Sequence, residues 1–114
     1  MPGQVTVREQ KVVVVVSGFH SEVDAKRCAN EVNDLLDRKT GLELVVDLTA
    51  IDGFSREARE VWQGYFRSYA KAVHTLTIVG GTALARMASA AVCLYAGIKM
   101  KTANHLSEVF PNDA

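Results

Sequence analysis

The chain has few cysteines and no net charge. Only two cysteines, Cys28 and Cys93, occur among 114 residues, and they form no CxxC pair, so we expect two free, buried thiols. Thirteen Lys and Arg balance thirteen Asp and Glu. The chain therefore lacks the basic excess with which general nucleic-acid binders neutralise phosphates, and we expect no nucleic-acid partner.

Segments that would direct the chain to or through a membrane are also lacking. No apolar run approaches the roughly 20 residues that cross a bilayer, and the N-terminus shows no basic segment followed by an apolar one. We therefore expect a cytoplasmic protein with no membrane span.

Complete catalytic, metal and phosphate motifs are missing as well. The histidines His20, His74 and His105 stand alone, without HExxH or CxxC, and we expect surface or capping roles for them. GxSxG and GxxxxGK[ST] are absent. Gly80-Gly81-Thr82 before a helix is open to two interpretations, a tight strand-to-helix turn or an anion site. We predict no catalytic residue, no metal site and no cofactor, which disfavours an enzyme.

What the chain does have is an apolar content of 48%. That content suffices for one domain over residues 1–114, with about two thirds of the unfolded surface buried. Apolar runs over 12–16, 42–48 and 75–79 indicate strands covered on both faces. Weaker alternation over 4–10 and 98–102 indicates two more strands, the second a lysine-guarded edge.

Helical periodicity separates these strands. A helix begins after Ser21 and ends before Gly41, with an apolar face made of Val23, Cys28, Val32, Leu35 and Leu36. A strongly amphipathic helix follows Ser55. An Ala-rich helix ends at Gly97 and carries the apolar side chains of Leu84, Met87, Ala88, Ala91 and Leu94. A short helix covers 105–110.

The element order is β-β-α-β-α-β-α-β-α. It predicts an α/β domain with a mostly parallel central sheet of about five strands, in which the first two strands are antiparallel.

Polar residues follow the second buried strand, in an expected exit loop after residue 48. Asp47, Thr49, Asp52 and Ser55 gather where α/β sheets bind ligands. A phosphate on Ser55 would lie at the positive end of a helix dipole, with Arg56 and Arg59 nearby. An ordinary N-cap is the other interpretation of Ser55. The carboxylates of Asp47 and Asp52 could form an acid/base pair, but no nucleophile, metal or second base accompanies them.

Four aromatic residues form a stripe on the same helix. At helical spacing, such a stripe belongs either to the core or to the wall of a pocket for an apolar ligand or partner. The residues are Trp62, Tyr65, Phe66 and Tyr69.

The stretch Leu44–Ser55, followed by a long helix, resembles the anti-sigma-factor antagonist or STAS domain family. There a strand ending in Asp-Leu leads through a loop to a helix whose first turn carries a phosphorylatable Ser or Thr. The later segments Thr77–Gly81, Ala96–Ile98 and Leu106–Glu108 are similar to the second half of that family. Switched members have Asp-Ser-Ser-Gly or Asp-Ser-Thr-Gly at the helix start, whereas this chain has Gly-Phe-Ser-Arg-Glu over 53–57, so only Ser55 carries over.

The resemblance implies a STAS-like, non-enzymatic regulatory module that binds a partner protein, a regulator or a kinase. Phosphorylation of Ser55 is the candidate switch. The implied partner-binding residues are Asp52, Gly53, Phe54, Ser55, Arg56 and Arg59.

The alternative function is that of a SEC14-like carrier of a small apolar or lipid ligand, because similar SEC14-type proteins include lipid binders. The aromatic stripe would line its pocket. Homo-oligomerisation fits either function, since zero net charge removes long-range repulsion between copies.

Overall fold

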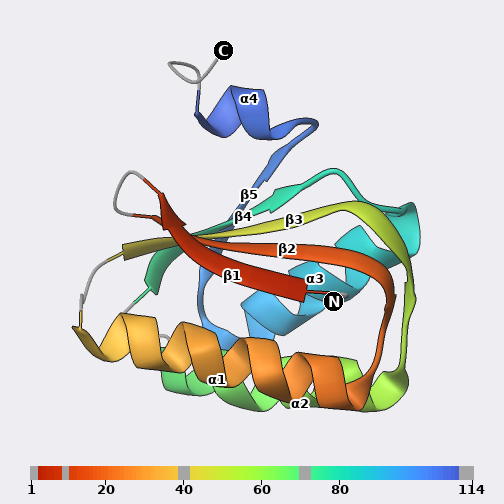
Figure 1. Cartoon of the computed structure of the whole chain (residues 1–114), viewed down its shortest axis with the longest axis horizontal. Coiled ribbons are helices and arrows are strands. Elements are labelled where there is room, and N and C mark those ends of the chain that lie inside the picture. Colours follow the sequence, from red (N-terminus) through yellow and green to blue (C-terminus); the bar gives the residue numbers. More distant parts are fainter. Residues whose placement is uncertain (1–2, 9–10, 39–41, 70–72, 111–114) are drawn as a thin grey trace.

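In the computed structural model, which describes residues 3–8, 11–38, 42–69 and 73–110, five strands form one sheet in sequential order (Figure 1). Strand β1 (Gly3–Arg8) pairs antiparallel with β2 (Lys11–His20). Strands β3 (Leu42–Phe54), β4 (Val73–Val79) and β5 (Lys99–Ala103) follow in parallel. The predicted mostly parallel sheet and its antiparallel first pair are confirmed.

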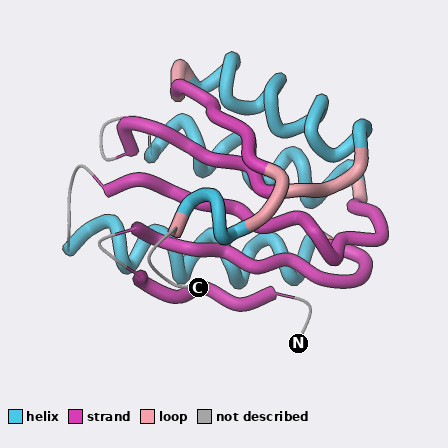
Figure 2. The backbone as a smooth tube through the Cα atoms, turned by 90° about the horizontal axis from the view of Figure 1, so that it is seen from above, coloured by secondary structure: helices cyan, strands magenta, loops and turns pink. Residues whose placement is uncertain are grey.

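Three long helices cover one face of this sheet. They are α1 (Glu22–Arg38), α2 (Arg56–Tyr69) and α3 (Ala83–Ala96). The short α4 (Leu106–Val109) lies over the other face, as the view from above shows (Figure 2). None of the helices in the described part of the chain has the length and apolar character needed to span a bilayer.

The valine run of β2 supplies both faces of the core. Val12, Val14 and Val16 belong to the cluster shared with the three long helices, whereas Val13 packs with Phe110 on the opposite face. The strand is therefore buried on both faces, as its β-branched run predicted. Phe110 is only 1% exposed, so this one side chain closes much of the face that α4 covers.

The predicted ends of β2 and β3 are wrong. Strand β2 continues past the apolar run over 12–16 as far as His20, and the expected exit loop of the next strand continues β3 as far as Phe54. Pairing persists because register shifts occur between Val15 and Ser17 and between Gly18 and Phe19. Such bulges absorb an extra residue and bend the strand, and both strands curve toward the helical layer (Figure 1).

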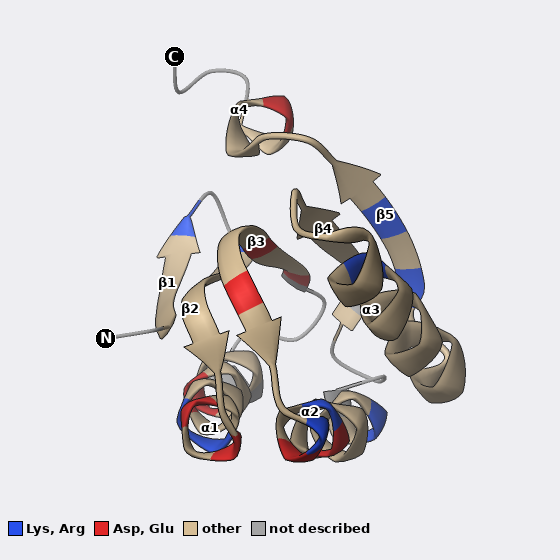
Figure 3. Cartoon of the chain, turned by 90° about the vertical axis from the view of Figure 1, so that its right-hand side faces the viewer, with Lys and Arg blue, Asp and Glu red and all other residues tan. Residues whose placement is uncertain are grey.

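The larger apolar side chains of α3 do not face the core. Leu84, Met87 and Leu94 are exposed, Leu94 by 85%. The residues of α3 that are buried are smaller, namely Ala85, Val92 and Cys93. As Figure 3 shows, α3 carries little charge on any side, unlike α1 and α2, so the sequence does not indicate which side of α3 faces the sheet. The expected helix end at Gly97 is confirmed by its left-handed φ of 77°, and the expected cap at Gly41 lies outside the described residues.

Candidate functional site

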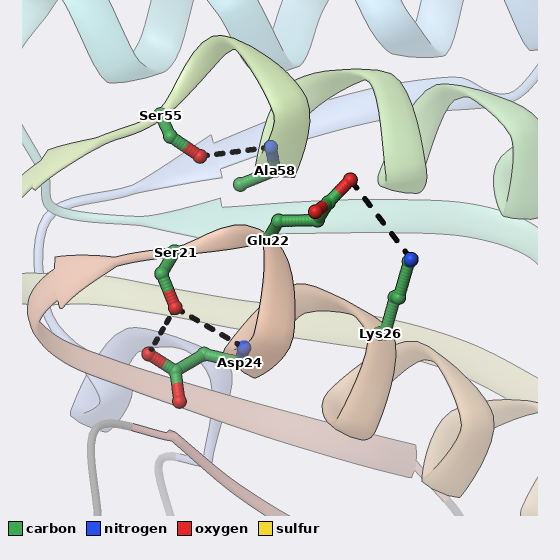
Figure 4. A network of polar contacts seen from close by, with 6 residues as sticks. All are labelled: Ser21, Glu22, Asp24, Lys26, Ser55 and Ala58. Atoms are coloured by element: carbon green, nitrogen blue, oxygen red, sulfur yellow. Dashed lines mark hydrogen bonds and ion pairs between the residues drawn. The ribbon is translucent and has the colours of Figure 1, made fainter.

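Two helices begin side by side where β2 and β3 end. Ser21 Oγ accepts the Asp24 N–H at 3.3 Å and donates to Asp24 Oδ2 at 2.9 Å. Ser55 Oγ accepts the Ala58 N–H at 3.0 Å. Figure 4 shows both serines at their helix starts. The Ser55 N–H donates to the His20 carbonyl at 3.0 Å, which fixes the start of α2 against the end of β2.

Ser55 is therefore an N-cap, and its half-buried hydroxyl lies at the positive end of α2. Asp52 is exposed near the end of β3. Arg56 pairs with Glu60 one turn along the helix, at 3.2 Å. Arg59 is also exposed, and its guanidinium forms no hydrogen bond or ion pair with any other described residue. The structure thus brings the predicted partner-binding residues to one edge of the sheet.

Asp47 and Thr49 form a local contact of their own. The Asp47 carboxylate accepts the Thr49 N–H at 2.9 Å and its hydroxyl at 2.6 Å. Gly80 packs against Thr49, since a Cβ there would lie 2.7 Å from Thr49 Oγ1. Thr82 then caps α3 by accepting the Ala85 N–H at 3.1 Å. These contacts favour the tight-turn interpretation of 80–82.

Two exposed apolar residues at the same edge were missed by the sequence analysis. Phe19 is 58% exposed and Val23 is 75% exposed, although Val23 was predicted to face the core. The Phe19 ring borders Gly53, where a Cβ would lie 3.4 Å from Cδ1. Phe19 and Gly53 face each other across β2 and β3 and are far apart in the sequence, so only the fold reveals this contact. We define the helix-start surface as Phe19, Val23, Asp52, Gly53, Phe54, Ser55, Arg56 and Arg59.

A cavity of about 80 Å³ lies behind this edge, between the sheet, α2 and α3. Aliphatic side chains of β2, β3 and β4 line it, together with Trp62 and Phe66. The two rings meet edge to face, with centroids 5.5 Å apart. Tyr65 instead lines a groove between α1 and α2 and donates a hydrogen bond to Asn30. The Tyr69 side chain lies outside the described residues, so the predicted aromatic stripe divides between two places.

His20 is a buried residue of this cavity, 4% exposed, which corrects its predicted surface or capping role. Trp62 Nε1–H donates to His20 Nε2 at 2.9 Å. Because an indole nitrogen only donates, Nε2 must be unprotonated, and the neutral ring carries its proton on Nδ1. Burial lowers the pKa of His20; the nearby Asp24 carboxylate opposes this effect and the Arg27 guanidinium adds to it.

The two thiols are buried and free, as expected. Burial raises the pKa of Cys93 to about 11 and also raises that of Cys28. Both thiols therefore stay protonated at neutral pH, and a thiol in that state is a poor nucleophile.

No family model and no curated protein matches the chain. A solved structure does: an uncharacterized protein of the DUF3478 family from Shewanella loihica PV-4, described as having a SpoIIAA-like fold. The TM-score is 0.73 over 98% of this chain and 92% of that one, at 13% identity. The chain has a SpoIIAA-like fold. The resemblance to STAS domains is thus confirmed for the fold, and at this identity the SpoIIAA-like neighbour shows nothing beyond it.

Proposed function

We propose that the protein is a non-enzymatic regulatory module that binds a partner protein through the helix-start surface. The exposure of Phe19 and Val23 beside the charged side chains of Asp52, Arg56 and Arg59 is the observation that carries this proposal. Exposed apolar residues rimmed by polar ones are typical of protein interaction sites. Protonated thiols, and an Asp47 carboxylate engaged by Thr49, support a role in binding rather than catalysis.

Phosphorylation of Ser55 is the proposed switch. A phosphate adds about −1.5 to −2 charges at pH 7, and on Ser55 it would lie at the positive end of α2. The guanidinium of Arg59, four residues along the same helix, has no partner among the other described residues and would pair with the phosphate. The modification would turn a weakly charged docking surface into an anionic one and would weaken binding to a partner fitted to the unmodified surface.

Affinity capture with variants of the whole chain tests the docking surface. The wild-type chain and a Leu84→Asp variant, changed on the outer face of α3, should retain the same partner from an extract of the source organism. Phe19→Asp should lose it. Equal recovery by all three proteins would contradict the proposal.

The switch is tested separately with Ser55→Asp and Ser55→Ala. We expect the aspartate variant to bind the captured partner more weakly than the alanine variant, because only aspartate places a negative charge at the start of α2. Identical binding by the two variants would remove the switch and leave the docking surface standing.

A second candidate function, a carrier of a small apolar ligand, is favoured by the cavity that Trp62 and Phe66 line. Native mass spectrometry of freshly purified protein should then show a mass above that of the bare chain. A clean mass, together with no uptake of added apolar compounds, would count against it.

A further inference from the structure

The outward side of α3 is apolar and exposed. Leu84, Met87, Leu94 and Tyr95 are each more than half exposed to solvent. Three exposed alanines complete this side of the helix, namely Ala83, Ala90 and Ala91. We define the α3 face as these seven residues. It departs from the usual pattern, because surface helices ordinarily turn charged and polar residues outward.

The polar groups beside the α3 face are engaged within the chain. Arg86 is the single charged residue of α3, all of whose residues are described, and its guanidinium donates to the Ala103 carbonyl at 3.2 Å. The Tyr95 hydroxyl accepts a hydrogen bond from Arg67 of α2 at 3.0 Å. A helix that is apolar on all sides is typical of one that is buried on all sides. The α3 face therefore predicts that something covers it.

The distribution of charge favours a second copy of the chain as this cover. Helices that bind membrane surfaces carry Lys or Arg beside their apolar side, and the α3 face carries neither. Lys99 and Lys101 of the neighbouring β5 alternate with Met100, which packs with the cluster under the long helices, so the lysines face the other side of the sheet. Charged side chains of a different protein would lose water on the α3 face without gaining a partner. A second α3 face brings no charge that would lose its water.

The spacing of the α3 face suits pairing with an identical helix that runs in the opposite direction. Leu84, Met87, Ala91 and Leu94 recur at i, i+3, i+7 and i+10, which is the spacing of the two core positions of a coiled coil. An antiparallel pair sets Leu84 against Leu94 of the partner subunit, and Met87 against Ala91 of the partner subunit. Each large methionine then meets a small alanine, so the layers interdigitate. A parallel pair would set Ala91 against itself and leave a gap.

The surroundings of α3 leave room for this pairing. Figure 3 shows α3 at the margin of the helical layer, beside β5 and on the side of α2 away from α1. Antiparallel helices also place the positive end of one helix dipole beside the negative end of the other.

The area of the α3 face suffices for a weak dimer. Side chains of this size carry roughly 150–200 Å² each. At their observed exposure, the four large ones present about 400–550 Å² per copy to solvent. Two copies would bury on the order of 1,000 Å² in total, which is about the minimum for a specific interface.

We propose that two copies of the chain form an antiparallel, two-fold symmetric dimer through their α3 faces. This inference goes beyond the proposed function, because the helix-start surface lies at the beginnings of α1 and α2 and stays free in each copy. The dimer would therefore present two docking surfaces. Leu84→Asp, the control for the docking surface, should be monomeric and should still retain the captured partner.

Sedimentation velocity of the whole chain tests the dimer, at concentrations from about 2 to 200 µM, a range that spans the Kd of roughly 10–100 µM expected for so small an interface. The wild type should shift from monomer to dimer across this range. Met87→Asp should stay monomeric throughout, because it places two carboxylates near the centre of the apolar interface. Val23→Asp, the same kind of change at an exposed apolar position of α1, should dimerise like the wild type. A monomeric wild type, or equal behaviour of the two variants, would overturn the proposal.

Mixtures of charged variants test the antiparallel arrangement and do not depend on Met87→Asp being folded. Residue 84 of one copy should meet residue 94 of the other, so an equimolar mixture of Leu84→Glu and Leu94→Lys should dimerise about ten-fold more tightly than either variant alone. A mixture of Leu84→Glu and Leu84→Lys should show no such gain, because the two substituted positions lie at opposite ends of the interface. A gain in the second mixture alone would overturn the antiparallel pairing.

Vesicles of phosphatidylcholine and phosphatidylglycerol test the other possible cover of the α3 face. We expect the wild type not to float with these vesicles in a density gradient. Flotation of a wild type that remains monomeric at every concentration, abolished by Met87→Asp, would show that a membrane covers this face and would overturn the dimer.

Discussion

At the scale of single residues, His20 links the end of β2 to α2 through two different groups. Its carbonyl accepts the Ser55 N–H, and its Nε2 accepts the Trp62 N–H. Protonation of Nε2 would set a donor against the donor of Trp62 and break this contact. The neutral imidazole is therefore the form that the folded protein needs.

Stability should accordingly fall in mild acid. Burial lowers the pKa of His20 in the folded state below its ordinary value of 6.5, so the unfolded chain takes up this proton first. The contribution of neutral His20 to the free energy of unfolding is complete above pH 6.5, and it is lost as the pH falls from 6.5 through the lowered pKa. Urea unfolding at pH 7.5 and 5.5 should show a larger loss for the wild type than for His20→Gln, which cannot titrate. An equal loss in both proteins would contradict the role of His20.

The capping role of Ser55 predicts a cost that does not depend on any partner. Ser55→Ala removes the acceptor for the Ala58 N–H, and loss of an N-cap costs about 1 kcal/mol. Ser55→Asp should cost less, because aspartate also caps helices and favours the positive helix end. Urea unfolding of the two variants checks this ranking, with Ser68→Ala, at an exposed position later in α2, as the control. A larger loss for aspartate than for alanine would contradict it.

At the scale of secondary-structure elements, α4 has only four residues, and its main contribution is the position of Phe110. The ring packs with Val13, Val45 and Val79. The guanidinium of Arg8 also lies over it, 4.3 Å from the centroid. A short helix can thus close the second face of the sheet because one large side chain fills the space.

Phe110→Ala should therefore lower the free energy of unfolding by about 3–5 kcal/mol, the usual cost of removing a buried aromatic side chain. Leu94→Ala, at an 85% exposed position, is the matched control and should change it by less than about 0.5 kcal/mol. Chemical denaturation of both variants gives the comparison. A similar small effect of both would mean that Phe110 does not close the sheet.

The elements themselves could largely be predicted from the sequence, because β-branched runs and helical periodicity are local signals. The ends of β2 and β3 could not. Residues such as Gly18 and Asp47 are typical of turns, yet here they pair across a neighbouring strand with the help of bulges. The orientation of α3 was equally hidden, since a helix with little charge on any side gives no signal for the side that faces the sheet.

In the candidate site, too, local features could be predicted from the sequence and long-range contacts could not. The position of Ser55 at a helix start follows from local spacing and is confirmed. The contact of His20 with Trp62 joins residues 42 positions apart, so only the fold reveals it. The exposure of Val23 likewise depends on how the first turn of α1 meets its neighbours, which periodicity alone does not determine.

At the scale of the whole molecule, both hydrophobic clusters share strands β2, β3 and β4. Neither cluster can melt without loss of the strands that form the other. We therefore expect one cooperative unfolding transition, in which Trp62 fluorescence and far-UV circular dichroism have the same urea midpoint. Two separate midpoints would show that the helical layer and the face under α4 unfold independently.

The central claim is that partners dock on the helix-start surface, and site-specific photo-crosslinking tests it most directly. A photoreactive phenylalanine analogue replaces either Phe19 or Leu94, two exposed apolar residues on different parts of the surface, in cells of the source organism. We expect a specific crosslinked partner from position 19, weaker in a Ser55→Asp background, and none from position 94 other than a second copy of the chain. A crosslink to another protein from position 94 alone would contradict it.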